Sequence, residues 1–478
     1  MRNAAKSVLM SSVATPDLSL QMPGPPRTLI GWRKYALEMS RDPILYLTKA
    51  YRTYGLISAW NPANPIQVFA FGPAYNRRIF TEADVFHSNP SKDLKMPKDS
   101  SLILLRSGLL SLNGSIHRQH RLWMQPAFHR KSVNAFCSAI IEVTEQVLDT
   151  WQAGSQIDFE HEMKLLVHRI AMKTVLGLDG AHEAETLGAL IERLYGSLNL
   201  WTMVFQFDLP GTGYRKMLRV GDEIAAYLRD LVQRKRNQGD SPQDVLGMML
   251  ASSDAEGRSM TEADLVAEAY TVMCHETSAS ALTWTMFLLL QHPTVMADLL
   301  DELEGRLRGS VPTSEQLADL PLLDCVLKES FRVLPPAAFG NRYTVQPTKL
   351  GPYAIPKGAT VTFSQFITHR LAELYPDPTR FIPARWLTTR PSPYEYLPFG
   401  FGAHSCIGMQ FATTEIKLVI ALILRRYRLS LAHGKQVDYC MRLSLSPKAG
   451  LAMIVHPQDR KIQKQDVTGS IRELVNLE

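Results

Sequence analysis

The stretch "FGFGAHSCIG", residues 399–408, decides the fold class of this chain. It places one thiol, Cys406, among three glycines and two phenylalanines, directly before a long apolar run. Glycine lets a backbone approach another group closely, so the stretch predicts a thin loop that lies against something. A helix is predicted from about Ile407 to Tyr427, and a thiolate just ahead of a helix N-terminus is stabilised by the helix dipole and the free N–H groups.

Two interpretations of Cys406 follow from the residues alone. A lone cysteine is usually a buried structural thiol. The alternative is a thiolate that binds a soft metal centre. Zinc would need three more protein ligands, and the neighbouring sequence offers none. Haem needs only one axial ligand from the protein, because the porphyrin fills four positions.

Composition and charge are those of an ordinary soluble globular protein. The chain has 478 residues, of which 45% are hydrophobic and 21% charged, and its formal net charge is +6. With so modest a charge and no long basic block, no nucleic-acid partner is predicted. The five cysteines are odd in number, widely spaced and without a C-x-x-C pair, so neither a disulfide framework nor a zinc ribbon is expected. Reduced thiols in the cytoplasm are the simple interpretation, and we expect a monomer.

Most of the chain reads as helix, with few short strands. Apolar residues recur at helical spacing over 131–153, 216–235 and 293–308, whereas 66–72 and 359–366 read as strands. There is no βαβ alternation and no low-complexity linker. These patterns favour one large, mainly α domain with small β-sheets.

Both ends of the chain read as separate from that domain. Residues 1–21 are expected to be a loose arm, the domain spans 22–456, and 457–478 is a polar tail in which "SIRELVNL" could form a helix. The apolar patch near the N-terminus is too short for a signal peptide or a membrane span.

The longest predicted helix runs over about 262–291 and is apolar nearly all round, which indicates burial. Glu268, His275 and Glu276 inside it argue against a lipid environment. A zinc-protease H-E-x-x-H site is excluded, because position 279 is Ala. Burying an unpaired carboxylate is costly. Glu276 is therefore paired, protonated or facing a wet cavity, and in the last case it would handle protons.

The helix "LKESFRVLPP" carries Glu329 and Arg332 three residues apart on one face, where they can pair. A surface salt bridge is the ordinary interpretation. Apolar residues on both sides indicate that the pair is partly buried.

Taken together, the motifs resemble those of the cytochrome P450 family. "FGFGAHSCIG" is similar to the haem-ligand signature F-x-x-G-x-[RH]-x-C-x-G, "MCHETS" to [AG]-G-x-[DE]-T-[TS], and "LKESFR" contains E-x-x-R. "YPDPTRFIPARWL" (375–387) resembles P-D-P-x-x-F-x-P-x-R-W, and "GSIHRQHR" resembles G-x-x-H-x-x-x-R. All stand in the family's order, and the resemblance spans about residues 22–456. The defined positions of the first signature are filled by Phe399, Gly402, His404, Cys406 and Gly408.

The resemblance implies the cytochrome P450 fold, with haem b between the long central helix and the cysteine-bearing loop. Cys406 would ligate the iron as a thiolate, Phe399 would pack near the sulfur, and the loop glycines would let backbone amides tune it. By the resemblance, the haem propionates would be held by His117, Arg121, Arg342 and His404. Arg118 or His120 could take the role of His117 if that helix is rotated. The resemblance also implies a structural triad formed by Glu329, Arg332 and Arg385.

The implied activity is that of a haem-thiolate monooxygenase. It would insert one oxygen atom of dioxygen into a C–H or C=C bond of a lipophilic small molecule such as a fatty acid, terpenoid or polyketide. Glu276 and Thr277 resemble the family's acid–alcohol pair, in which the carboxylate brings protons and the hydroxyl bonds to the bound oxygen. Met273 and Cys274 depart from the motif's Ala and Gly; the first should crowd the pocket, and the second puts the dioxygen groove in doubt.

The sequence also suggests the surroundings of the site. Apolar pocket walls are expected from 101–110, 198–207 and 335–340. Electrons would come from a ferredoxin or flavodoxin with its reductase, an acidic partner that would suit a basic face, although scattered solvated charge is an equal interpretation. That face would comprise Arg118, Arg121, Arg130, Lys131, Lys417, Arg425 and Arg426.

Two other functions stay open. A P450-like isomerase or lyase would act on peroxides without dioxygen or a reductase, and the Glu276–Thr277 pair argues against it. A non-catalytic haem sensor would need no such pair.

Overall fold

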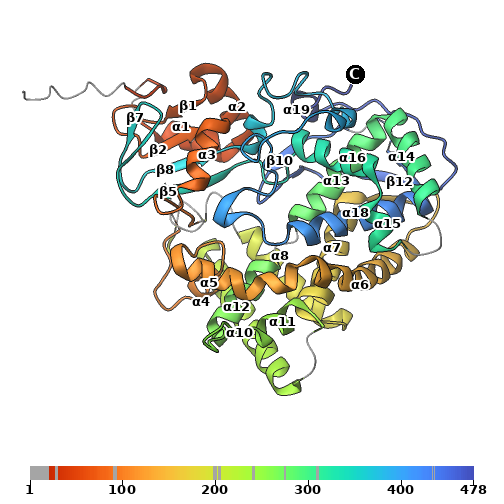
Figure 1. Ribbon diagram of the computed structural model, residues 1–478, viewed down its shortest axis with the longest axis horizontal. Coiled ribbons are helices and arrows are strands. Elements are labelled where there is room, and N and C mark those ends of the chain that lie inside the picture. Colours follow the sequence, from red (N-terminus) through yellow and green to blue (C-terminus); the bar gives the residue numbers. More distant parts are fainter. Residues whose placement is uncertain are drawn as a thin grey trace, which may run out of the picture.

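The computed structural model describes residues 21–26, 31–89, 94–197, 202, 206–239, 243–273, 276–307, 312–432, 434 and 436–478. The chain is mainly helical with small sheets, as predicted (Figure 1). The described helices are α1 (Arg33–Arg41), α2 (Pro43–Tyr54), α3 (Pro73–Thr81), α4 (Ser101–Leu105), α5 (Gly114–Met124), α6 (Arg130–Asp149), α7 (Phe159–Leu176), α8 (Ala181–Ser197), α10 (Gly213–Gln238), α11 (Val245–Ala251), α12 (Glu262–Val272), α13 (Glu276–Gln291), α14 (Pro293–Arg306), α15 (Ser314–Ala318), α16 (Pro321–Val333), α17 (Gln365–Thr368), α18 (Met409–Arg426) and α19 (Ile471–Leu474).

The strands form four sheets within the described residues. The largest has the order β1-β2-β8-β5-β3, the next β4-β12-β9, and two are hairpins, β6-β7 and β10-β11. The strands are β1 (Ile57–Ala59), β2 (Gln67–Ala70), β3 (Phe86–His87), β4 (Gln156–Asp158), β5 (Gly340–Thr344), β6 (Thr348–Leu350), β7 (Tyr353–Ile355), β8 (Thr360–Phe363), β9 (Tyr427–Leu431), β10 (Tyr439–Met441), β11 (Leu445–Pro447) and β12 (Ala452–Pro457).

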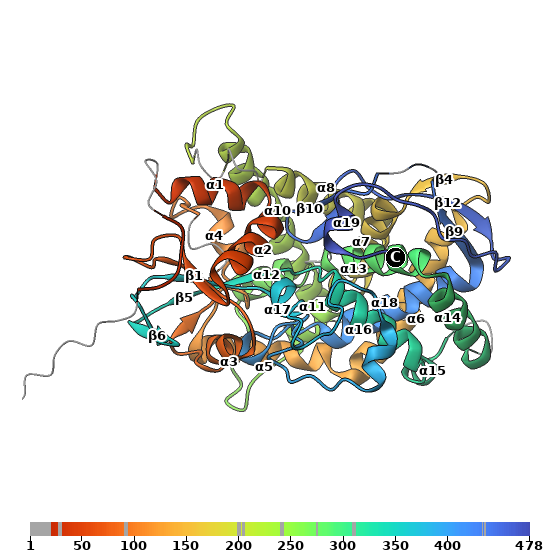
Figure 2. The same cartoon turned by 90° about the horizontal axis from the view of Figure 1, so that it is seen from above.

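The two larger sheets lie at opposite ends of the molecule. The five-stranded sheet, with α1 to α3, occupies one end of the long axis, and β4-β12-β9 lies at the other end (Figure 2). Helices fill the space between them, and α13 packs against α7, α16 and α18 near the middle. A strand predicted over 359–366 stops earlier, because Ser364 accepts a hydrogen bond from Ile367 N and caps α17.

Helix α18 follows the cysteine-bearing loop directly, as predicted, and packs against α6 and α13. Leu418, Val419, Ile420, Ala421 and Ile423 are fully buried in the main core. Within the described chain, the stretch Gly402–Arg426 is the one that is long and apolar enough to cross a membrane, and 67% of its most apolar window is buried in the protein. Its apolar character is therefore that of a core helix.

The predicted central helix is described as two segments, α12 and α13. Thr261 caps α12 through a capping box with Asp264. The Met273 N–H still donates to Ala269 O at 3.2 Å, but its ψ of −1° is no longer that of a regular helix. Cys274 and His275 lie outside the described residues. Fourteen consecutive residues of α13, Ser278–Gln291, are buried, which agrees with the predicted core position.

The C-terminal tail, 457–478, packs onto the domain rather than extending from it. Five of its apolar side chains are buried in the main core, and Arg370 Nη2 donates to Leu474 O at 3.2 Å. The short predicted helix forms as α19. Residues 1–20 of the expected N-terminal arm lie outside the described residues. The buried tail residues are Val467, Ile471, Leu474, Val475 and Leu477.

Candidate active site

The cysteine-bearing loop is a tight turn closed by backbone hydrogen bonds. The Cys406 N–H donates to Phe399 O at 2.8 Å, and the Gly408 N–H donates to the Cys406 sulfur. The Phe399 ring contacts Phe331 of α16 edge-on, with centroids 5.7 Å apart. The loop is thus fixed to α16 while the sulfur lies beside the N-terminus of α18.

Two loop glycines adopt conformations that other residues avoid. Gly400 has φ +67° and Gly402 has φ +73°. A Cβ on Gly402 would lie 2.5 Å from Phe80 O of α3, so a side chain there is excluded. Gly408 differs, because its Cβ would meet Phe128 and the cysteine sulfur only at ordinary contact distances of 3.9 and 4.0 Å.

Cys406 lies in a hollow. The residue is exposed to solvent, yet burial by the surrounding protein raises the pKa of its thiol, and Arg121 opposes this rise. A group that is both accessible and surrounded must face a concave surface. Such a site suits a large ligand that covers the sulfur.

Four cationic or imidazole side chains converge beside this hollow. Arg121 donates to Ser405 O at 2.8 Å and to Ser405 Oγ at 3.1 Å, which ties α5 to the loop. The rings of His117 and His404 lie 4.1 Å apart between centroids. Arg342 of β5 lies over the rings of Phe80 and Phe363.

The charges of this cluster have no counterpart in the described chain. Burial, followed by neighbouring Arg121, lowers the pKa of His117 to about 4, and burial, followed by Arg342, lowers that of His404 to about 3. Burial alone lowers the pKa of Arg342 to about 10. No carboxylate among the described residues contributes to these shifts, and His117 Nε2 is buried without a hydrogen-bond partner. The cluster therefore fits the two propionates of a haem.

The alternatives to His117 point elsewhere. His120 is buried, and its Nδ1 is 2.8 Å from Glu268 Oε1 of α12, whose other oxygen accepts from Leu109 N at 3.0 Å. Arg118 is exposed. Trp123, which the sequence reasoning passed over, has a buried indole N–H without a partner.

Glu329 is the centre of a buried polar network. The carboxylate of Glu329 and the guanidinium of Arg332 are fully buried and joined by two hydrogen bonds of 2.8 and 2.9 Å. Arg385 Nε donates to the same carboxylate at 2.9 Å. Two further donors were not foreseen: Trp386 Nε1 and the Ile382 N–H, each at 2.9 Å. The indole fills the last position of the motif in 375–387, which was its only signal.

Arg332 extends the network to the segment that follows α17. Its remaining N–H groups donate to the carbonyl groups of His369, Pro378 and Arg380 at 2.7 to 2.9 Å. A fully paired ionic network of this kind fixes the segment 376–386 against α16.

The predicted acid–alcohol pair begins α13. Thr277 is exposed and Glu276 partly buried. Burial is the main cause of a raised pKa of Glu276. The carboxylates Glu160 and Glu192 push this pKa in the same direction. The cations Lys164 and Arg442 oppose them.

Glu276 lines a cavity of about 740 Å³ between α6, α7 and α8. The outer wall includes Glu142 and Asp179, whose side chains are 53% and 79% exposed. Lys164 lines the same cavity and pairs with Glu160 at 2.7 Å. Of the three possibilities left by the sequence, the carboxyl of Glu276 thus faces a polar cavity that reaches the surface.

The predicted pocket wall 101–110 contains both buried and exposed residues. In the wall 101–110, Leu102, Leu105 and Leu109 are buried in the core, whereas Leu110 is 53% exposed. Most of 198–207 lies outside the described residues.

The predicted basic face is smaller than expected. Lys417 is buried, donates to Leu317 O and pairs with Asp324, so its inclusion was wrong. Arg426 pairs with Asp149. Arg118, Arg130 and Lys131 are exposed.

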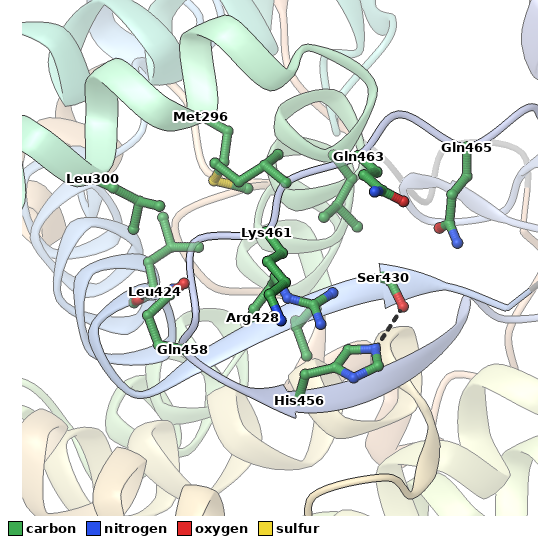
Figure 3. A pocket seen from close by; sticks show the side chains of 13 residues that line it. Met296, Leu300, Leu424, Arg428, Ser430, His456, Gln458, Lys461, Gln463 and Gln465 are labelled. Carbon is green, nitrogen blue, oxygen red and sulfur yellow. Dashed lines mark hydrogen bonds between the residues drawn. The ribbon is translucent and has the colours of Figure 1, made fainter.

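A smaller cavity of about 180 Å³ lies between α14, α18, β9, β12 and the segment 458–465 (Figure 3). His456 and Ser430 meet there at 2.9 Å (Figure 3). None of its thirteen lining residues is a predicted site residue.

Comparison with known proteins places these features in a family. The family model for cytochrome P450 matches residues 22–455. Cyclooctat-9-en-7-ol 5-monooxygenase of Streptomyces melanosporofaciens is 30% identical over 74% of this chain and 77% of its own. Cyclooctatin synthase of the same organism is 29% identical over 89% of this chain and 93% of its own.

Solved structures agree with the sequence relatives. Cyanobacterial CYP120A1 with bound retinoic acid superposes with a TM-score of 0.77 at 25% identity, covering 86% of this chain and 93% of that one. The haem domain of cytochrome P450DA superposes with a TM-score of 0.80 at 22% identity, covering 92% and 99%, and supports the fold. The chain belongs to the cytochrome P450 family and is a haem-thiolate monooxygenase.

Proposed function

We propose that this chain is a cytoplasmic, monomeric monooxygenase that carries haem b on Cys406. It inserts one oxygen atom of dioxygen into a C–H or C=C bond of a lipophilic small molecule. The observation that carries the assignment of the site is the hollow at Cys406, beside which four cationic or imidazole groups meet no carboxylate of the described chain. When bound, haem supplies the activation of dioxygen, which no side chain can perform.

The chain's own residues bind and orient the group. Cys406 offers its sulfur, and the Gly408 N–H donates to that sulfur and limits its basicity. Arg121 and Arg342 neutralise the propionates, while His117 Nε2, buried and unpartnered, donates a hydrogen bond to one of them. His404 takes the place where arginine is commoner in the family, so this edge carries one fixed charge fewer.

Glu276 and Thr277 manage protons at the start of α13. Glu276 takes protons from the cavity that it lines and passes them toward Thr277, which is exposed. The raised pKa of Glu276 suits this task, because a carboxyl that titrates nearer neutrality both accepts and releases a proton readily. Met273, the last residue described before this turn, is 2% exposed.

A lipophilic substrate such as a terpenoid, fatty acid or polyketide is supported by the relatives. Two of them are named for cyclooctat-9-en-7-ol and cyclooctatin, and one was crystallised with retinoic acid. The electrons come from an acidic ferredoxin or flavodoxin with its reductase, for which the exposed Arg118, Arg130 and Lys131 provide positive charge.

The test supplies the purified holoenzyme with NADPH, ferredoxin, ferredoxin reductase and dioxygen, together with compounds chosen from a lipophilic library by substrate-induced spin-state shift. Product that requires dioxygen and is lost in Thr277→Ala is the expected result. Turnover of organic peroxides without reductant would instead indicate an isomerase or lyase. No turnover under either condition would indicate a haem sensor, and both of these outcomes overturn the proposal.

A further inference from the structure

The C-terminal tail follows the part of the chain that the family model matches. The match ends at residue 455, within β12, and the tail continues to residue 478. Its short helix α19 lies beside β10 in both views of the molecule (Figure 1, Figure 2). The contacts that the tail makes are therefore a feature of this chain, added to the matched domain.

Two backbone hydrogen bonds join the tail to the segment just before β10. The Val437 N–H donates to Thr468 O at 2.8 Å, and the Ile471 N–H donates to Val437 O at 3.1 Å. Both backbone groups of Val437 are thus paired with the tail. The side chains of Val437 and Ile471 are 3% and 0% exposed, so this contact is buried.

Ser470 adds a reciprocal pair of bonds at the base of the hairpin β10–β11. Its N–H donates to Asp438 Oδ1 at 2.7 Å, and its Oγ accepts from the Tyr439 N–H at 3.2 Å. Asp438 O accepts from the Lys448 N–H at 2.8 Å, which links the two ends of the hairpin. The tail therefore holds the hairpin where its two strands begin and end.

The turn that presents Ser470 requires glycine. Gly469 has φ +103°, a backbone conformation that residues with a side chain rarely adopt. A Cβ at this position would lie 2.5 Å from Val437 O and 2.9 Å from Asp438 Oδ1. The backbone of the tail thus approaches the base of the hairpin more closely than any other residue type would allow.

The hairpin transmits this fixation to α13. Leu445 of β11 is fully buried, and its carbonyl oxygen accepts from Ser280 Oγ and Trp284 Nε1. Its N–H donates to Pro336 O at 2.9 Å, in the third predicted pocket wall. Ser280 follows Thr277 by three residues in α13. Leu445 therefore joins that wall to the part of α13 that follows Thr277.

The tail also reaches the other end of α13. Gln291, the last residue of that helix and 2% exposed, donates from Nε2 to Gln465 O at 3.1 Å. The helix is thus held by the tail directly at its C-terminal end and through the hairpin nearer its start.

We propose that the C-terminal tail is a positioning element. Through Gly469 and Ser470 it fixes the hairpin β10–β11, and through Leu445 the hairpin sets how α13 and the wall at Pro336 lie relative to each other. The tail thereby determines the shape of the space beside Thr277. The proposal rests on the proposed function, which gives that space to a lipophilic substrate, and it assigns the tail no contact with haem or substrate.

The test compares the affinities of the ferric holoenzyme for two nitrogen ligands of haem iron, imidazole and clotrimazole, by absorbance titration. Clotrimazole is an imidazole that carries three aromatic rings, so only its binding depends on walls that are already in place. In Gly469→Ala and Ser470→Ala the ratio of clotrimazole to imidazole affinity should fall by about fivefold, the factor for one net hydrogen bond. Amide hydrogen exchange of the hairpin, 439–447, should become faster in both variants.

Gly257→Ala is the matched control. Gly257 has φ +77°, but nothing lies within 4 Å of a Cβ built on it, so this variant adds the conformational strain without the clash. It should leave the affinity ratio and the exchange of 439–447 unchanged. If Gly469→Ala does not fold, Ser470→Ala decides, because it removes one acceptor and adds no atom.

Three results would overturn the proposal. The first is an unchanged affinity ratio in Ser470→Ala, which would leave the tail a structural role alone. The second is an equal fall of the ratio in Gly257→Ala. The third is a proportional loss of affinity for both ligands, which would indicate general damage to the haem site.

Failure of the proposed function gives a different result. If the holoenzyme oxidises no lipophilic compound but the affinity ratio falls as expected, the assigned activity is wrong and the positioning role of the tail remains. If oxidation is found but the ratio does not change, the positioning role is wrong and the activity remains.

Discussion

The imidazole rings of His117 and His404 lie with their centroids 4.1 Å apart, one on α5 and the other in the cysteine-bearing loop. Both are held neutral by burial and by the arginines beside them. The two imidazoles and the two guanidinium groups of Arg121 and Arg342 interact electrostatically, and no carboxylate of the described chain is among the groups that shift the imidazoles. The stability of such a site depends on an anion from outside. This dependence can be measured in the protein without haem.

The apoprotein should lose stability on acidification more steeply than the holoenzyme. The native pKa values of His117 and His404, about 4 and about 3, lie below the ordinary value of 6.5. The unfolded chain therefore binds protons that the native chain refuses, and the free energy of unfolding falls as pH drops from about 6.5 toward 4. Urea unfolding of the apoprotein between pH 7 and 5 measures this slope.

His117→Gln should flatten that slope, and haem should flatten it as well, because propionates stabilise the protonated rings. His161→Gln is the control, since this histidine is exposed and lies outside the cluster. An apoprotein whose acid slope is unchanged by His117→Gln would contradict the assignment.

Replacing the central carboxylate of the buried network should release haem. Glu329→Gln keeps the shape of the side chain but leaves Arg332 and Arg385 without their negative partner. Removing one member of a buried ion pair costs about 3–5 kcal/mol. The expected result is a loss of most haem from the purified protein, measured by absorbance per mole of chain.

Glu223→Gln is the matched control for that experiment. Glu223 pairs with Arg193 at 2.9 Å, but both side chains are nearly half exposed, so the pair is worth less than about 1 kcal/mol. Normal haem content in Glu329→Gln would show that the network is not needed to retain haem.

Alanine substitutions at two glycines of the loop distinguish a steric requirement for glycine from a conformational one. Gly400→Ala and Gly402→Ala both place an L-residue at positive φ, which costs about 1–2 kcal/mol. Only the second also drives a Cβ to 2.5 Å from Phe80 O. Gly402→Ala should therefore lose haem and thermal stability. Gly400→Ala should lose only the stability that an L-residue at positive φ costs, about 1–2 kcal/mol. Equal midpoints of thermal unfolding for the two variants would show that α3 gives way freely.

Cys406→Ser should abolish the reduced carbon monoxide spectrum typical of a thiolate haem. A serine hydroxyl at this place is a poor ligand, because it does not ionise as a thiol does. Cys440→Ser, a partly buried cysteine of β10, is the control and should keep the spectrum. An unchanged spectrum in Cys406→Ser means that another residue binds the iron.

The sequence predicted what depends on short-range order. The helix that follows the loop 399–408 and the pairing of Glu329 with Arg332 each involve residues within a few positions. Motif spacing then added Arg385, because its motif is defined along the chain.

What the sequence missed depends on contacts between distant segments. Lys417 was predicted on a basic face, but it is buried where α15 packs against α18, and it pairs with Asp324 of α16. In the same way, the polar composition of the C-terminal tail gave no sign that five of its apolar residues are buried in the core. No local pattern marks the buried Glu415 of α18 either, since its partner Ser278 lies on another helix.

Glu415 predicts a pH dependence opposite in sign to that of the histidines. Burial raises its pKa from 4.5 to about 8, while the hydrogen bond from Ser278 lowers it, and no charged group is among the causes. The native protein therefore retains a proton that the unfolded chain releases above pH 4.5, so the free energy of unfolding falls as pH rises from 4.5 toward 8. Glu415→Gln cannot ionise and should escape this loss.

The stability of Glu415→Gln relative to wild type should increase by up to about 1.4 kcal/mol for each pH unit between pH 5.5 and 8. Urea unfolding of both proteins at pH 5.5, 6.5, 7.5 and 8.5 gives the difference, and it should level off above about pH 8, where wild-type Glu415 ionises in the native state too. Ser278→Ala removes the bond that favours the charged form, and its own loss of stability should therefore continue to a higher pH. Parallel pH profiles for wild type and Glu415→Gln would mean that Glu415 is ionised in the native core and that an unseen cation compensates it.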